Sequence, residues 1–123
     1  MATHANVHFT ENGQPMANVY VNSDGYPDSP TGMIARLEQF FADVEDQTSE
    51  TRFLEASYLA AKYVVWMAGR TATEGKPLEF RGVGVAVADA ADGSYVYRVE
   101  CGHRSRRLHC GRYGWPVVTW RKA

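Results

Sequence analysis

The chain has 123 residues and a formal net charge of −1. This length corresponds to one domain with a sizeable core, and the near-zero net charge gives no argument for a polyanionic partner. Residues 1–8 lack the basic start and apolar centre of a signal peptide, and no apolar run approaches the ~18 residues of a membrane span. Two cysteines, Cys101 and Cys110, are too few for a disulfide scaffold. We expect a single domain, residues 1–123, that is soluble, reduced and cytoplasmic, with no membrane partner.

The charges are unevenly distributed along the chain. Residues 1–60 contain nine acidic and two basic residues, a balance of −7, whereas residues 61–123 contain eleven basic and five acidic residues, a balance of +6. Such asymmetry is typical of a partner-binding face. The alternative is that the two halves attract each other, or neighbouring copies of the chain.

A β-hairpin is predicted near the start of the chain. Residues 7–10 alternate between apolar and polar side chains, and a second alternating run covers residues 17–21. Asn12 and Gly13 lie between the two runs and favour a tight turn. His4 and His8 stand apart from other chemically reactive side chains in the sequence.

The stretch 23–27, Ser-Asp-Gly-Tyr-Pro, separates the hairpin from a helix. Asp24 and Gly25 favour a turn with positive φ, and Pro27 pushes Tyr26 toward extended geometry. Helical spacing then predicts a helix to about residue 45, with one apolar stripe made of Met33, Ile34, Leu37, Phe40, Phe41 and Val44.

A second helix is predicted from about Glu50 to Ala68. Ser49 is placed to cap its beginning and Gly69 to follow its end as C′. Near its end this helix is apolar over most of its circumference, which indicates a central position or a contribution to an oligomer interface.

Strands are then predicted over residues 80–87, 95–101, 108–113 and 115–120. The order is ββααβββ(β), and runs of strands and runs of helices favour the α+β class. We expect an antiparallel β-sheet with two helices packed on one face.

The residues Tyr20 to Pro27, Tyr-Val-Asn-Ser-Asp-Gly-Tyr-Pro, resemble a motif of small bacteriophage and prophage proteins. In that group the strand commonly ends Tyr-Arg-His before the Asp-Gly-Tyr-Pro core, so Val21 and Asn22 depart from the pattern. The resemblance covers about two thirds of the chain, and only the Ser-Asp-Gly-Tyr-Pro core is specific. It implies origin in a mobile element, an action against host defences, and the host cytoplasm as the location. Most members of the group have no assigned activity.

A basic stretch covers residues 98–112 and is predicted to be a hairpin with its tip near Ser105. Guanidinium groups suit phosphates, and the tyrosines nearby suit stacking on a base. The predicted ligand-binding surface combines this hairpin with the turn at Asp24–Tyr26, and its residues are Asp24, Tyr26, Arg98, His103, Arg104, Arg106, Arg107 and Arg112. The alternative is a solvated basic hairpin tip without a ligand.

The same stretch contains Cys101, His103, His109 and Cys110, which are the residue types that zinc prefers. Adjacent residues 109 and 110 point to opposite faces of a strand, so we expect no metal and no cofactor. In the hairpin register Cys101 lies opposite Cys110, either as two reduced thiols or as a disulfide. Asp24 and Asp28 offer an acid pair, but there is no nucleophile elbow and no His-Glu-x-x-His motif.

The sequence thus predicts a protein that works by binding and has no catalytic residues. The first expectation is a non-enzymatic phage-type accessory protein that binds a host defence component or a phosphate-bearing nucleotide signal. The alternative is a nucleic-acid-binding module that uses the basic 98–112 hairpin, and an enzyme is the third possibility. Trp66, Trp115 and Trp120 exceed what so small a core needs, which favours a homo-oligomer.

Overall fold

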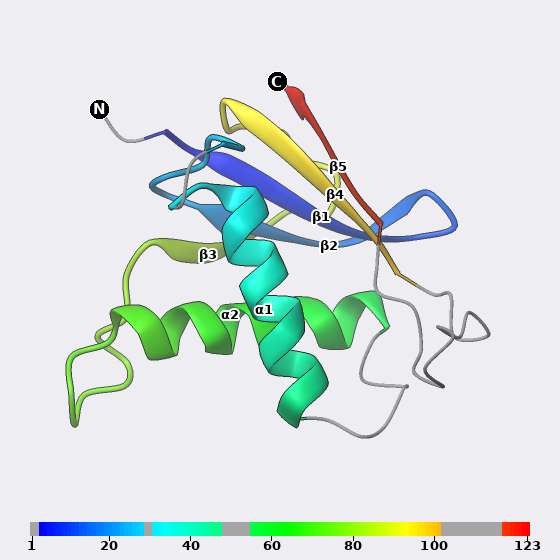
Figure 1. Ribbon diagram of the computed structural model, residues 1–123. Coiled ribbons are helices and arrows are strands. Elements are labelled where there is room, and N and C mark those ends of the chain that lie inside the picture. The colour runs from blue at the N-terminus through cyan, green and yellow to red at the C-terminus, as the bar shows by residue number, and fades with distance from the viewer. Residues whose placement is uncertain (1–2, 29–30, 48–54, 102–116) are drawn as a thin grey trace.

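The computed structural model describes residues 3–28, 31–47, 55–101 and 117–123. Within these ranges the chain forms five strands and two helices, as Figure 1 shows. The elements are β1 (Ala5–Glu11), β2 (Gln14–Val21), α1 (Met33–Gln47), α2 (Ala56–Thr71), β3 (Val83–Ala86), β4 (Tyr95–Cys101) and β5 (Val117–Lys122). The predicted α+β class and the order of its described elements are confirmed.

The strands form one sheet in the order β3-β2-β1-β4-β5. Three of the four neighbouring pairs are antiparallel, as expected. The central pair is parallel, because β1 and β4 align from Ala5 beside Tyr95 to Glu11 beside Cys101. The sheet is therefore mixed. A parallel pair needs a long connection, and here that connection contains β2, both helices and β3.

The predicted hairpin at residues 7–21 is confirmed. β1 and β2 pair antiparallel, and both residues of the turn have positive φ, 51° at Asn12 and 78° at Gly13. Two positive φ values are the geometry of the type I′ turn, whose twist matches that of paired strands. Asn and Gly are the residues that adopt this geometry at least cost.

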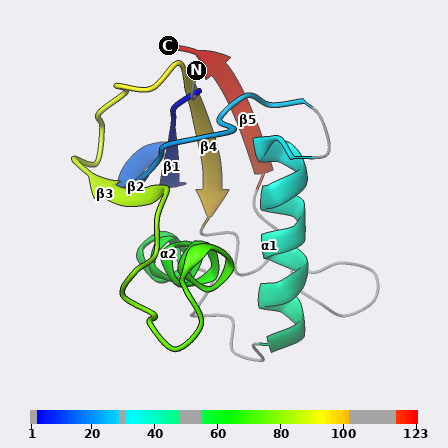
Figure 2. The ribbon, with the colours of Figure 1, turned by 90° about the vertical axis from the view of Figure 1, so that its left-hand side faces the viewer.

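Both helices pack on the same face of the sheet. Figure 1 shows α2 running along the sheet and α1 crossing it steeply, and Figure 2 looks almost down the axis of α2. Phe40 of α1 and Tyr63 of α2 meet edge to face with ring centroids 5.0 Å apart, and Phe9 of β1 lies 6.0 Å from Tyr63. Alternate strand residues, including Val7, complete this core. Burial of these apolar side chains is the main stabilising contribution.

The second helix begins and ends later than predicted. Glu55 has extended backbone (φ −64°, ψ 151°), and the carboxylate of Glu11 accepts a 2.9 Å hydrogen bond from the backbone N–H of Ala56. Gly69 is not the C′ residue, because the helix continues to Thr71. The hydroxyl of Thr71 donates to the carbonyl oxygen of Met67 at 3.1 Å, and the N–H of Ala72 donates to the Ala68 oxygen at 2.8 Å and closes the last turn. The predicted cap at Ser49 lies outside the described residues.

The predicted strands at 80–87 and 115–120 are both observed with shifted limits. β3 is confined to Val83–Ala86, and β5 extends two residues further, to Lys122. The predicted strand at 108–113 and the tip of the basic hairpin lie outside the described residues. Among the described helices, none combines the length and the hydropathy needed to cross a membrane.

Candidate functional site

A row of polar side chains crosses the sheet on the face opposite the helices. Asn18 of β2 pairs with His8 of β1, His8 with Arg98 of β4, and Arg98 with Thr119 of β5. Paired residues point to the same face of a sheet, and core residues such as Val7 alternate with them. These four residues, which we call the polar row, therefore lie side by side away from the helices.

Residues 87–94, which we call the strap, join β3 to β4 and lie over one end of the polar row. The side-chain amide of Asn18 donates to the carbonyl oxygens of Val87 at 2.7 Å and Ala90 at 2.8 Å. His8 Nε2 donates to the same Ala90 oxygen at 2.7 Å. Asn6 joins the network, because its amide nitrogen donates to Asn18 at 3.2 Å and its amide oxygen accepts from the Gly93 N–H at 2.8 Å.

The strap explains why polar residues are buried on this face. Asn6, His8, Thr10 and Asn18 are all at most 6% exposed. Buried polar groups destabilise a protein unless they are hydrogen-bonded. His8 and Asn18 bond directly to carbonyl oxygens of the strap, and Asn6 is linked to them through the Asn18 amide. Asn18 and His8 therefore have a structural role in holding the strap. The other end of the polar row, Arg98 and Thr119, is open.

A shallow pocket of about 220 Å³ occupies the open half. It is lined by His8, Val96, Arg98, Thr119, Trp120 and Arg121. Within the described part of the chain, Arg98 forms no ion pair or side-chain hydrogen bond, and Arg121 bonds only to a neighbouring backbone oxygen, at 3.4 Å. The pocket therefore presents two guanidinium groups that the described residues leave uncompensated.

One carboxylate on this face, that of Glu100, is held by groups other than the arginines. Glu100, two residues beyond Arg98 on β4, accepts hydrogen bonds from the backbone N–H groups of Asn12 at 3.1 Å and Gly13 at 2.7 Å. It also accepts from the hydroxyl of Thr10 at 3.2 Å. Glu100 thus stabilises the β1–β2 turn, which leaves the positive charge of Arg98 available to an external anion.

The arrangement is suited to binding an anion. Arginine presents its donors as a planar fork that matches two oxygens of a phosphate or carboxylate, and the Thr119 hydroxyl lies on the adjacent strand. Among the described residues there is no group of three or more His, Cys, Asp or Glu side chains placed to hold a metal ion.

Of the predicted ligand-binding residues, the structure places Arg98 in this pocket and two others elsewhere. Asp24 and Tyr26 belong to the turn on the helix face, where the Tyr26 hydroxyl donates to Asp24 at 3.2 Å. Arg36 of α1 donates to the backbone oxygens of Ser23 and Asp24. The sheet separates these residues from Arg98. His103, Arg104, Arg106, Arg107 and Arg112 lie outside the described residues.

The sequence did not indicate three polar residues of the pocket: His8, Thr119 and Arg121. His8 is isolated in the sequence, although its alternation with Val7 and Phe9 places it on one face of β1. Its neighbours across the sheet belong to β2 and β4, and only the pairing of strands reveals them. The position of Arg121 is predictable from the sequence, because alternation along 117–122 puts it on the same face as Thr119.

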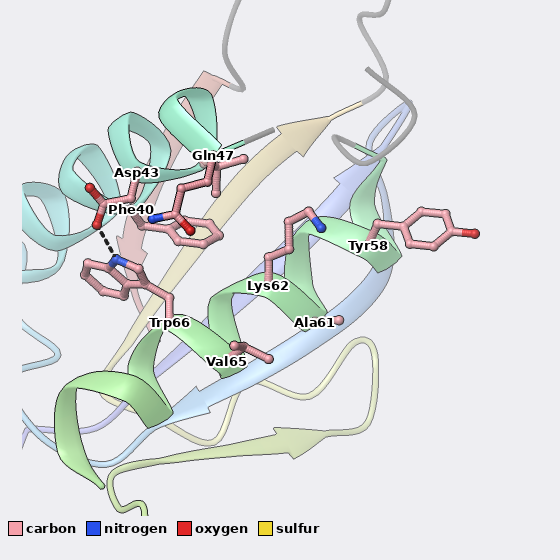
Figure 3. Close-up of a pocket in the computed structure, with 9 residues that line it drawn as sticks. Phe40, Asp43, Gln47, Tyr58, Ala61, Lys62, Val65 and Trp66 are labelled. Atoms are coloured by element: carbon pink, nitrogen blue, oxygen red, sulfur yellow. Dashed lines mark hydrogen bonds between the residues drawn. The ribbon is translucent and has the colours of Figure 1, made fainter. Parts of the chain in front are cut away.

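A larger groove of about 520 Å³ lies between the two helices. Figure 3 shows Phe40, Asp43 and Gln47 of α1 on one side and Lys62, Val65 and Trp66 of α2 on the other. The indole N–H of Trp66 donates to the Asp43 carboxylate at 2.8 Å and ties the helices together across the groove. The other oxygen of Asp43 accepts from the Gln39 amide at 3.0 Å. The groove is mainly apolar, and the only described carboxylate along it is engaged.

Cys101 is a buried free thiol at the end of β4. Burial, reinforced by the carboxylates of Glu11 and Glu100, raises the pKa of this thiol to about 12. A thiol acts as a nucleophile or metal ligand as the thiolate, so Cys101 is chemically inert at neutral pH. Its predicted neighbour Cys110 lies outside the described residues.

Comparisons of the chain with protein-family models, with curated proteins and with solved structures give no match.

Proposed function

We propose that this chain is a non-enzymatic binding protein that holds a phosphate-bearing ligand, such as a nucleotide signal, in the pocket at the open end of the polar row. The observation that carries the proposal is the position of Arg98. It lies between His8 and Thr119 on adjacent strands, and no described carboxylate pairs with it. The role of a phage accessory protein directed at a host defence component is part of the same proposal and rests on the Ser-Asp-Gly-Tyr-Pro motif.

The chemistry of the pocket favours phosphate over an apolar ligand. Two arginines and a hydroxyl line a shallow space, and hydrogen bonds from a charged donor are worth about 1.5–3 kcal/mol each. His8 is fixed by Ala90, so its ring offers a positioned surface. A ligand of this kind is held by charge and geometry, and it leaves chemically unchanged.

The proposal is tested by titrating the full chain with inorganic phosphate and with a panel of nucleotides and dinucleotides by calorimetry. We expect Arg98→Gln to weaken binding about tenfold or more, because it removes a charge-assisted donor. Arg81→Gln is the matched control, because Arg81 is an exposed arginine just before β3, outside this pocket. Equal affinities for wild type and Arg98→Gln, or a ligand recovered in altered form, would overturn the proposal.

The salt dependence of binding distinguishes the alternative, a nucleic-acid-binding module. The affinity of such a module falls steeply with salt, in proportion to the number of phosphates contacted, and extends over many sequences. A single-phosphate site shows a shallow dependence and prefers one ligand. A steep dependence shared by unrelated oligonucleotides would replace the proposed function with this alternative.

A further inference from the structure

Among the described residues, β5 is an edge strand with no strand on its outer side, and the Lys122 oxygen accepts a 3.4 Å hydrogen bond from the Arg121 side chain. The strand lies at one end of the strand order, and Figure 1 shows it as the outermost strand on its side. The backbone N–H of Ala123 donates to the Ser94 oxygen at 3.0 Å. Hydrogen-bonded pairs alternate along an antiparallel ladder, so Arg121, Thr119 and Val117 are the β5 residues whose backbone groups bond to β4. The N–H and C=O groups of the intervening residues, Val118, Trp120 and Lys122, therefore point away from the sheet.

The side chains of this edge also favour association. Trp120 is 46% exposed, although its ring packs against Tyr95 at a centroid distance of 5.8 Å. A large aromatic residue on a sheet edge that no described strand covers is typical of an interface. The opposite edge of the sheet, β3, offers only four residues and is a weaker template.

We propose that β5 pairs with β5 of a second copy of this chain, antiparallel and centred on Trp120, and that the two copies together complete the anion site. With this centre, Trp120 faces its own counterpart and Val118 faces Lys122 of the other copy. All three residues with outward-pointing backbone groups then exchange hydrogen bonds. Centring on Arg121 would leave Val118 unpaired and place two arginines directly opposite each other, which is unfavourable.

The pairing changes the pocket, which is why the inference rests on the proposed function. Thr119 comes to lie opposite Arg121 of the second copy, on the same face as the polar row. The row of one copy then reads His8, Arg98, Thr119 and the second copy's Arg121. By symmetry, the row of the second copy runs in the opposite direction and ends on Arg121 of the first copy. The two copies of Arg121 lie diagonally across the new strand pair, at about 7–8 Å between backbones.

This geometry defines the class of ligand. Arginines from both copies gather on one face, and their repulsion opposes the dimer unless an anion lies between them. A ligand with two phosphate groups neutralises both sides at once, whereas a single phosphate reaches one. Binding of such an anion and dimerisation are therefore thermodynamically coupled. We expect pyrophosphate to tighten the dimer roughly tenfold or more, and inorganic phosphate to do so less.

The experiment measures the dimer dissociation constant of the full chain by analytical ultracentrifugation, alone and with pyrophosphate or inorganic phosphate. Lys122→Pro removes an outward N–H and no described bond to β4, so it should yield a folded monomer. Val85→Lys, on the opposite edge, is the matched control and should remain a dimer. Arg121→Gln should keep the dimer and abolish the effect of pyrophosphate.

The outcomes separate this inference from the proposed function. A wild-type monomer in pyrophosphate, or a Lys122→Pro variant that is still dimeric, would overturn the β5 interface even if phosphate binds. A dimer whose dissociation constant is unchanged by pyrophosphate would overturn the shared site. Loss of phosphate binding in Arg98→Gln but not in Arg121→Gln would support the proposed function and overturn the contribution of the second copy.

Discussion

The hydroxyl of Tyr97 donates a buried 2.6 Å hydrogen bond to the carbonyl oxygen of Gly25, 72 residues earlier in the chain. Burial raises the pKa of Tyr97 above its ordinary value, so the hydroxyl remains a donor throughout the neutral range. This contact fixes the turn before α1 to the centre of the sheet. The Gly25 N–H also donates to the Thr3 oxygen at 2.8 Å, which ties the same turn to the chain before β1.

Replacing Tyr97 with Phe should lower the free energy of unfolding by about 1–3 kcal/mol, because the Gly25 oxygen is left buried without this partner. The measurement is the urea midpoint, with the m-value unchanged. Tyr95→Phe is the control: Tyr95 lies on the same face of β4 and none of the described hydrogen bonds uses its hydroxyl. A similar loss in both variants would contradict the role given to the Tyr97 hydroxyl.

Gly25 and Gly69 should respond oppositely to alanine. A Cβ at Gly25 would lie 2.7 Å from the Thr3 oxygen, so the backbone must shift and the turn is destabilised. A Cβ at Gly69 meets no atom within 4 Å, and alanine in a helix interior is favoured over glycine by about 0.5–1 kcal/mol. Gly25→Ala should lower and Gly69→Ala should raise the midpoint of urea unfolding. Destabilisation by Gly69→Ala would indicate that the helix ends before this residue.

The elements that the sequence predicts well are those with local signals. The Asn12–Gly13 turn sets the first hairpin, and spacing alone locates α1 and β4. The parallel pairing of β1 with β4 has no such signal, because it joins residues about 90 positions apart. A glycine at position 69 suggests a stop, but the helical hydrogen bonds continue past it to the one from the Ala72 N–H to the Ala68 oxygen.

The candidate site was predictable only in part, for the same reason. Arg98 was identified from the basic composition of its stretch, but its partners belong to three other strands. Asp24 was selected because it belongs to the distinctive motif, and the structure gives the motif a role in joining the turn to β4 and α1. In the sequence, the polar residues of β1 look like the solvent-facing side of a strand. They are buried because the strap lies over them, and no local signal predicts the path of the strap.

The strap should be held chiefly by Asn18. Asn18→Leu keeps the approximate volume but removes both donors to the Val87 and Ala90 oxygens. Each oxygen keeps a second partner, His8 for Ala90 and the Ala90 N–H for Val87, so the cost is that of two lost hydrogen bonds, about 1–3 kcal/mol in total. Hydrogen exchange should accelerate at the Ala90 N–H, which bonds to the Val87 oxygen at 2.9 Å. The control is Asn12→Asp at the exposed turn; if the Ala90 N–H exchanges equally fast in both variants, Asn18 does not hold the strap.

Alkaline pH should destabilise the protein through Cys101. The folded protein keeps this thiol protonated to about pH 12, whereas a thiol in the unfolded chain loses its proton near pH 8.5. Stability from the protonated thiol is complete below about pH 8.5 and is lost as pH rises toward 12, because the unfolded state binds fewer protons. Each pH unit in this window removes about 1.4 kcal/mol from the free energy of unfolding.

The measurement compares urea unfolding at pH 8 and pH 10 for wild type and Cys101→Ala. Alanine removes a buried sulfur atom, and the loss of packing that this causes does not depend on pH. Only wild type carries the thiol whose proton is lost on unfolding, so its stability should fall by about 2 kcal/mol more than that of the variant between the two pH values. Burial also raises the pKa values of Tyr63 and Tyr97, but these tyrosines are common to both proteins, so their contribution cancels in the comparison. Parallel losses would show that the environment of Cys101 does not hold its proton.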